Sequence, residues 1–90
     1  MKRCCIYISG RVQGVSFRSF TKQNAELLGL NGFVKNLDDG RVEVIVEGHE
    51  DKIEQLVEKI RQGPPRAKID DVSVTWEEAL GNFKGFDVKL

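Results

Sequence analysis

The chain has 90 residues, of which 40% are hydrophobic and 31% are charged. This length and composition are typical of one small globular domain, so we expect residues 1–90 to fold around a single core. The 14 Lys and Arg residues balance the 14 Asp and Glu residues, giving a formal net charge of zero, which argues against a long nucleic acid as a partner because such binding needs a basic excess. No apolar run approaches the roughly 20 residues of a membrane span. The run Cys4–Ile8 is too short for a signal peptide, so we expect a cytoplasmic protein that does not contact membranes.

The first part of the chain predicts a strand, a loop and a helix. Alternation of apolar residues predicts a strand over Cys4–Ser9, and the two glycines of Gly10–Ser16 indicate a loop. A helix is expected over Phe17–Leu28, and Gly29 is well placed to end it. Its predicted inward side is an imperfect stripe of Phe17, Phe20, Asn24, Leu27 and Leu28.

A hairpin and a second helix follow. Strands over Gly32–Leu37 and Arg41–Glu47 flank the turn signal Asp38-Asp39-Gly40. Glu50–Gln62 has the apolar spacing of a helix, and Gly63-Pro64-Pro65 ends it. The residues expected to face the core from this helix are Ile53, Leu56, Val57 and Ile60.

Two more strands complete the chain. Ile69–Glu77 should form a strand with Val72, Val74 and Trp76 inward, and Phe86–Leu90 should form a short last one. The order is then β-α-β-β-α-β plus a C-terminal strand. The simplest arrangement is an α+β, ferredoxin-like sandwich, in which an antiparallel sheet carries both helices on one face.

Several chemically reactive residues have ordinary structural explanations. Cys4 and Cys5 are the only cysteines. Because neighbouring residues on a strand point to opposite faces, we expect both to be small apolar strand residues that form neither a disulfide nor a zinc site. His49 is the only histidine and has no Ser or Cys nearby in the sequence with which to form a hydrolytic triad, so we expect an exposed loop residue. Asp38 and Asp39 are better turn formers than Mg²⁺ ligands. We therefore expect no metal site and no cofactor.

The loop before the first helix is a candidate anion site. Glycines let successive backbone N–H groups turn toward one point, and the N-terminus of the following helix adds positive potential. Arg18 would contribute a planar, permanently charged guanidinium suited to phosphate oxygens. A tight connection, in which the glycines serve only backbone geometry, explains the spacing equally well, so the residues alone leave both interpretations open. No Walker sequence is present.

Asn36 is the second candidate, since asparagine is disfavoured in strands and its amide can orient a water or a substrate oxygen. In isolation, a role in the adjoining turn is the simpler explanation. Without an evident nucleophile, base or metal, the chain could catalyse only a phosphate reaction driven by positioning and electrostatics. Acyl phosphates fit, because their carboxylate leaving group, with a pKa near about 4–5, needs no general acid.

The sequence resembles the acylphosphatase family over essentially its whole length. Gly10-Arg11-Val12-Gln13-Gly14-Val15-Ser16-Phe17-Arg18 is similar to the family signature G-[RK]-V-Q-G-V-x-F-R. Gly32-Phe33-Val34-Lys35-Asn36 is similar to its second block, G-[FYW]-V-x-N, which an Asp-Gly turn follows. A long signature with a second block at the right distance is a specific match.

The resemblance implies a metal-free and cofactor-free hydrolase that converts acyl phosphates to a carboxylate and inorganic phosphate. It implies that Arg18 binds the phosphate and that Asn36 positions the attacking water. The backbone N–H groups that would cradle the phosphate belong to Gln13, Gly14, Val15, Ser16, Phe17 and Arg18. Ser16 occupies a variable position where glycine or an aromatic residue is expected. We further expect the protein to be a monomer. Inorganic phosphate, a product of the reaction, should inhibit it.

Three other functions remain open at this point. A single-stranded RNA-binding module on the same fold is disfavoured by the zero net charge and by the few aromatic residues expected on the central strands, with Tyr7 the only candidate. A small-ligand or metal-chaperone domain would need a Cys-x-x-Cys loop, and the loop after the first strand contains no cysteine. A catalytically inactive interaction domain is compatible with the sequence.

Overall fold

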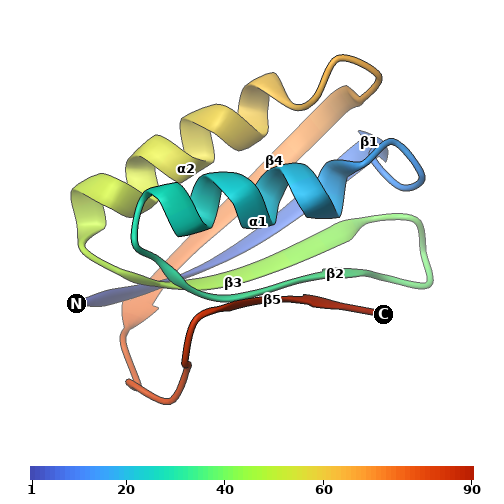
Figure 1. The fold of residues 1–90 in the computed structure, drawn as a ribbon. Coiled ribbons are helices and arrows are strands. Elements are labelled where there is room, and N and C mark those ends of the chain that lie inside the picture. Colours follow the sequence, from blue (N-terminus) through green and yellow to red (C-terminus); the bar gives the residue numbers. More distant parts are fainter.

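The computed structural model describes residues 1–90 as two helices packed on one face of a five-stranded sheet (Figure 1). The elements in chain order are β1 (Lys2–Arg11), α1 (Phe17–Leu27), β2 (Asn31–Asn36), β3 (Val42–Gly48), α2 (Glu50–Gln62), β4 (Lys68–Glu78) and β5 (Phe86–Lys89). This order confirms the prediction of β-α-β-β-α-β with a C-terminal strand. No helix is long and apolar enough to cross a membrane.

The sheet is mixed, which corrects the prediction that all strands are antiparallel. Its strand order is β4-β1-β3-β2-β5, and β5 pairs in parallel with β2, with Phe86 opposite Gly32. The direction of β5 follows from where β4 ends. Glu78 lies opposite Lys2, which also pairs with Gly48, so β4 ends at the same end of the sheet as β3. β2 begins at that end too, and a chain entering β5 there must run alongside β2 in the same direction.

The first strand is longer than the sequence predicted. β1 continues through Gly10 to Arg11 because β4 accompanies it as far as Lys68, with an irregular register after Ser9. Gly10 has φ 126°, and a Cβ atom there would collide with the Lys68 carbonyl oxygen. Only glycine fits this close approach of two backbones. The connecting loop is therefore shorter than predicted and begins directly at the end of the sheet.

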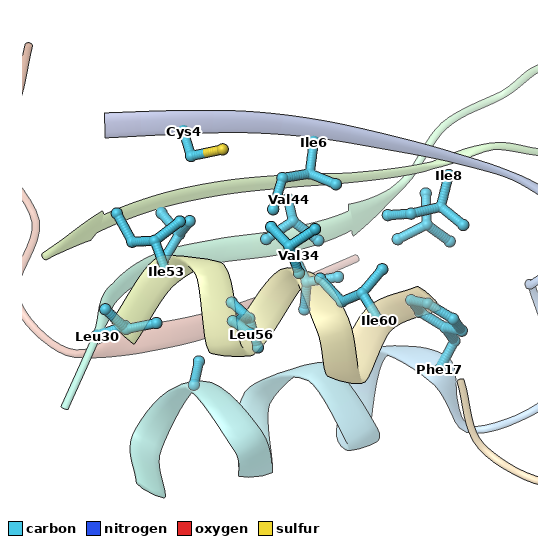
Figure 2. Close-up of a cluster of buried hydrophobic side chains, with 14 of the residues drawn as sticks. Cys4, Ile6, Ile8, Phe17, Leu30, Val34, Val44, Ile53, Leu56 and Ile60 are labelled. Carbon is cyan, nitrogen blue, oxygen red and sulfur yellow. The ribbon is translucent and has the colours of Figure 1, made fainter. Parts of the chain in front are cut away.

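The core lies between the helices and the sheet (Figure 2). Side chains from alternate strand positions meet the predicted face of α2, whose Ile53, Leu56, Val57 and Ile60 are all buried, as expected. The labelled strand residues in the figure include Cys4, Ile6, Ile8, Val34 and Val44. Burial of this apolar surface is the main stabilising contribution to a domain of this size.

The predicted inward face of α1 is right in part. Phe17 is buried and Leu28 packs half-buried against the core, but the other buried residues are Thr21 and Ala25, and Leu27 is 80% exposed. Thr21 can enter the core because its hydroxyl donates a hydrogen bond to the Phe17 carbonyl oxygen at 2.9 Å, so no polar group is left unpaired. The end of α1 agrees with prediction, since Gly29 has φ 71° and follows the last turn.

Trp76 lies on the predicted inward face with Val72 and Val74, since it pairs with the buried Cys4. It is nevertheless 41% exposed, while the two valines are half-buried. β4 is an edge strand, and α2 covers it incompletely. The segment after β4 is instead held by a buried carboxylate: Glu47 accepts hydrogen bonds from the backbone N–H groups of Leu80 and Gly81 at 2.9 and 3.0 Å.

Candidate active site

The loop between β1 and α1 is held by its apolar residues and leaves its backbone available. Val12 and Val15 are buried, 1% and 8% exposed, while Gly14 and Ser16 have positive φ values of 73° and 63°. Left-handed residues alternating with ordinary ones turn successive N–H groups to the same side. No backbone hydrogen bond is donated by residues 12–16, and the first N–H groups of α1 have no acceptor within the helix. The loop therefore presents free donors.

A pocket of about 140 Å³ opens at this loop, at the end of the sheet where the C-terminus also lies (Figure 1). It brings together Arg18 and Asn36, the two residues predicted to be catalytic. Its lining consists of Val12, Gly14, Ser16, Phe17, Arg18, Ser19, Asn36 and Val88. Of the predicted phosphate-binding residues, Gln13 and Val15 do not line the pocket.

Arg18 lies in the first turn of α1, half-buried, and its position depends on the C-terminal strand. Its Nη1 donates a hydrogen bond to the Lys89 carbonyl oxygen at 2.8 Å. It takes part in none of the ion pairs of the structure, so its positive charge is not neutralised by a carboxylate. A guanidinium held by a neutral carbonyl keeps its other N–H groups and its full charge for an anion.

Asn36 lies at the end of β2, opposite Val42. Its Oδ1 is buried and has no hydrogen-bond partner in the protein. A buried acceptor without a partner costs about 1–3 kcal/mol, so such groups are rare unless a ligand uses them. The turn after β2 does not need this side chain, because the Leu37 N–H donates to the Arg41 carbonyl and the Asp39 carboxylate accepts from the Arg41 backbone.

The carboxylate of Asp39 forms the turn, as predicted. It accepts hydrogen bonds from the Arg41 backbone N–H at 3.1 Å and from Arg41 Nε at 2.8 Å. These bonds hold the pKa of Asp39 below its usual value. His49 is exposed at the start of α2, also as predicted. The structure brings together no group of three or more His, Cys, Asp or Glu side chains that could hold a metal ion.

The cysteines are packing residues. Burial raises the pKa of Cys4 to about 12, and burial together with the neighbouring Glu77 raises the pKa of Cys5. A thiol must ionise to act as a nucleophile, so neither sulfur is reactive at neutral pH. Both lie on β1, well before the β1–α1 loop in the chain, and neither lines the pocket.

The open face of the sheet does not favour the RNA-binding alternative. The Tyr7 hydroxyl donates to Glu43 at 2.8 Å, and the Arg41 guanidinium covers the ring, 5.2 Å from its centroid. Lys89 Nζ lies 4.4 Å from the centroid of Phe33 in the same way. Bases stack on free aromatic faces, and these two rings are already occupied by the chain's own cations.

A larger groove, of about 480 Å³, runs between α2 and β4. It is lined by Glu50, Glu54, Val57, Glu58, Arg61, Val74 and Trp76. Its three carboxylates face a single guanidinium, so the local charge repels a phosphate. The smaller pocket at the β1–α1 loop is the one whose donors and charge suit an anion.

The comparison with protein families decides the identity. The family model described as acylphosphatase matches residues 4–88. The chain belongs to the acylphosphatase family. It is therefore an enzyme that hydrolyses acyl phosphates to a carboxylate and inorganic phosphate, acting on a small-molecule substrate, which confirms the sequence prediction.

Similar acylphosphatases cover nearly the whole chain. The acylphosphatase of Rubrobacter xylanophilus is 48% identical over 88 residues, which are 98% of this chain and 80% of that protein. That of Methanocella arvoryzae is 45% identical and covers 99% of this chain and all of its own. The crystal structure of acylphosphatase from Bacillus subtilis has a TM-score of 0.96 at 41% identity, with both chains fully covered. The ferredoxin-like prediction is thereby confirmed.

Two contributions to this acylphosphatase pocket could not be found from the sequence. One is the Lys89 carbonyl that holds Arg18, and the other is Val88, which lines the pocket. A backbone carbonyl carries no residue-type signal, and β5 reaches the site only because it runs parallel to β2. The remaining additions, Val12 and Ser19, adjoin the predicted loop residues in the chain, directly before Gln13 and directly after Arg18.

Proposed function

We propose that Arg18 and the β1–α1 loop hold the phosphoryl group of the substrate while Asn36 aligns the attacking water. The observation that supports this most is the meeting, in one small pocket, of free backbone donors, an un-neutralised guanidinium and a buried amide oxygen without a partner. The first two suit a phosphate, and the third suits a water that has hydrogens to donate.

The reaction needs only these groups. The water oxygen forms a bond to phosphorus, the bond from phosphorus to the acyl oxygen breaks, and the carboxylate leaves with the electron pair. One water proton stays on the phosphate and the other passes to solvent or to the phosphate oxygens. A carboxylate has a pKa near about 4–5, so it leaves without protonation. The backbone N–H groups of the β1–α1 loop, which form the phosphate cradle, and the Arg18 guanidinium stabilise the negative charge on the transferring phosphoryl group. Asn36 Oδ1 accepts a hydrogen bond from the attacking water.

The pocket supports the proposal that phosphate inhibits competitively, because the product carries the same oxygens that the cradle would bind. We further propose that the protein acts as a monomer formed by a single domain, residues 1–90. We also propose that the protein acts in the cytoplasm, binds no nucleic acid and requires neither a metal ion nor a cofactor.

The test separates binding from water alignment. Steady-state hydrolysis and inhibition by inorganic phosphate are measured for the wild type, Arg18→Ala and Asn36→Ala. We expect Arg18→Ala to lose both turnover and phosphate inhibition, and Asn36→Ala to lose turnover while phosphate still inhibits with an inhibition constant close to that of the wild type. Equal losses of phosphate inhibition in the two variants would contradict the division of roles.

A further inference from the structure

The side chain of Gln13 joins the two halves of the site. Its Nε2 donates one hydrogen bond to the Leu37 carbonyl oxygen at 2.8 Å and another to the Arg41 carbonyl oxygen at 2.9 Å. Gln13 lies in the phosphate-binding loop, and the two acceptors lie at either end of the turn between β2 and β3. Both N–H groups of one amide are thus used to link two loops that are far apart in the sequence.

The acceptors adjoin the residue that would align the water. Leu37 directly follows Asn36, and the Leu37 N–H donates to the Arg41 carbonyl at 2.8 Å as the last rung of the hairpin. The ladder of β2 and β3 fixes Asn36 on one side, with Val42 opposite. Beyond that rung the chain turns into solvent, so the two bonds from Gln13 are what hold this end of the hairpin against the loop.

The link has no substitute. Among the side-chain and turn hydrogen bonds of the structure, no other joins residues 12–16 to residues 37–41. Gln13 itself does not line the pocket, because its side chain is directed at the hairpin. The side-chain amide of Gln13 therefore does not bind the phosphate. Its remaining role is to hold the loop and the hairpin at a fixed distance.

We propose that Gln13 is a positioning residue, which sets the distance between the phosphate cradle and the Asn36 amide. This inference rests on the proposed function of Asn36. The reaction requires a water held simultaneously in line with phosphorus and within hydrogen-bond reach of Asn36 Oδ1. A displacement of about 1 Å can cost on the order of 100-fold in rate, so a loosened hairpin lowers turnover although every reacting group is still present.

The test replaces the amide by a side chain of similar length that cannot donate. We expect Gln13→Met to lower kcat about 10- to 100-fold, with the inhibition constant for inorganic phosphate within about threefold of the wild type. Gln23→Met is the matched control, because Gln23 is an exposed residue of α1 that makes no side-chain hydrogen bond; its kcat should not change.

A double variant distinguishes positioning from general loosening. Since Gln13 acts through Asn36, Gln13→Met should lower kcat little further once Asn36→Ala is present. The Asn36 side-chain amide signal in a ¹H–¹⁵N NMR spectrum should shift in Gln13→Met and not in Gln23→Met. If Gln13→Met does not fold, Gln13→Asn keeps the amide but is one methylene too short to reach both carbonyls, and the same losses are expected.

The outcomes are separable. Wild-type kcat in Gln13→Met, an unmoved Asn36 signal, or losses that multiply fully in the double variant would each overturn the inference, and the proposed function would stand. Equal loss of phosphate inhibition and kcat would overturn it too, since Gln13 would then be shaping the cradle. A wild type without activity on acyl phosphates would contradict the proposed function itself.

Discussion

Replacing Asn36 by leucine should stabilise the protein and inactivate it. The two side chains have nearly the same shape, but leucine has no acceptor to leave unpaired. The buried Oδ1 of Asn36 has no partner in the folded protein, and this costs about 1–3 kcal/mol. Recovering even the lower figure should raise the melting temperature by about 4–8 °C in a domain of this size. Turnover should fall about 100- to 1000-fold, the usual loss when one preorganised hydrogen-bonding group is removed from an active site.

Thermal unfolding followed by circular dichroism, beside steady-state hydrolysis, measures both effects. Asn31→Leu on the same strand is the control: the Asn31 Oδ1 accepts a hydrogen bond from the Gly85 N–H at 3.1 Å, so its loss should destabilise the fold. If Asn36→Leu melted below the wild type, the amide would be contributing to stability. If it turned over normally, the oxygen would have no part in the reaction. Either result would refute the reasoning.

Three further predictions follow from single contacts. Ser16→Gly should stabilise by roughly 0.5–1 kcal/mol, because relief of a left-handed conformation at φ 63° outweighs the added freedom of the unfolded chain; chemical denaturation measures this, and a destabilised variant would contradict it. Burial alone would raise the pKa of Glu47, but the Leu80 and Gly81 N–H groups and Arg3 leave it below its usual value. The stabilisation by ionised Glu47 is therefore fully present above the unfolded pKa of about 4.3 and is lost as pH falls through the folded pKa. Glu47→Gln should lower the free energy of unfolding at pH 7, and the difference from the wild type should vanish in acid. A difference in the free energy of unfolding that does not change with pH, measured by chemical denaturation, would contradict this prediction. Deleting Lys89 and Leu90 removes the acceptor that holds Arg18, and KM should rise about tenfold, as expected for one hydrogen bond to a charged group; an unchanged KM would show that Arg18 is held otherwise.

The features that the sequence predicted correctly depend on local patterns. The face of α2 follows from apolar spacing within one helix, and the hairpin follows from two alternating strands around Asp38-Asp39-Gly40. For the β1–α1 loop and Asn36, residue type and spacing left two interpretations open, and their proposed roles rest on the resemblance to the acylphosphatase signature. In the structure the turn forms without hydrogen bonds from the Asn36 side chain, and a catalytic role for Asn36 stays a prediction.

The features that were missed depend on contacts between distant segments. The parallel direction of β5 is set by where β4 ends, which no residue in β5 encodes. The buried face of α1 contains Thr21, whose hydroxyl is paired with the Phe17 carbonyl, so a scale that counts hydroxyls as polar leaves Thr21 out of the stripe. Alternation placed Trp76 on the correct face, but its exposure could not be predicted, because the incomplete cover of an edge strand depends on how α2 packs.

We propose that the backbone N–H groups of the β1–α1 loop and Arg18 catalyse hydrolysis of an acyl phosphate without a metal ion. The most direct test is hydrolysis of a synthetic aromatic acyl phosphate in the presence of a chelator, by the purified wild type and by Arg18→Ala, with folding of both checked by circular dichroism. We expect full chelator-resistant turnover in the wild type and none in the folded variant. Turnover that the chelator abolishes, or that survives the loss of Arg18, would contradict it.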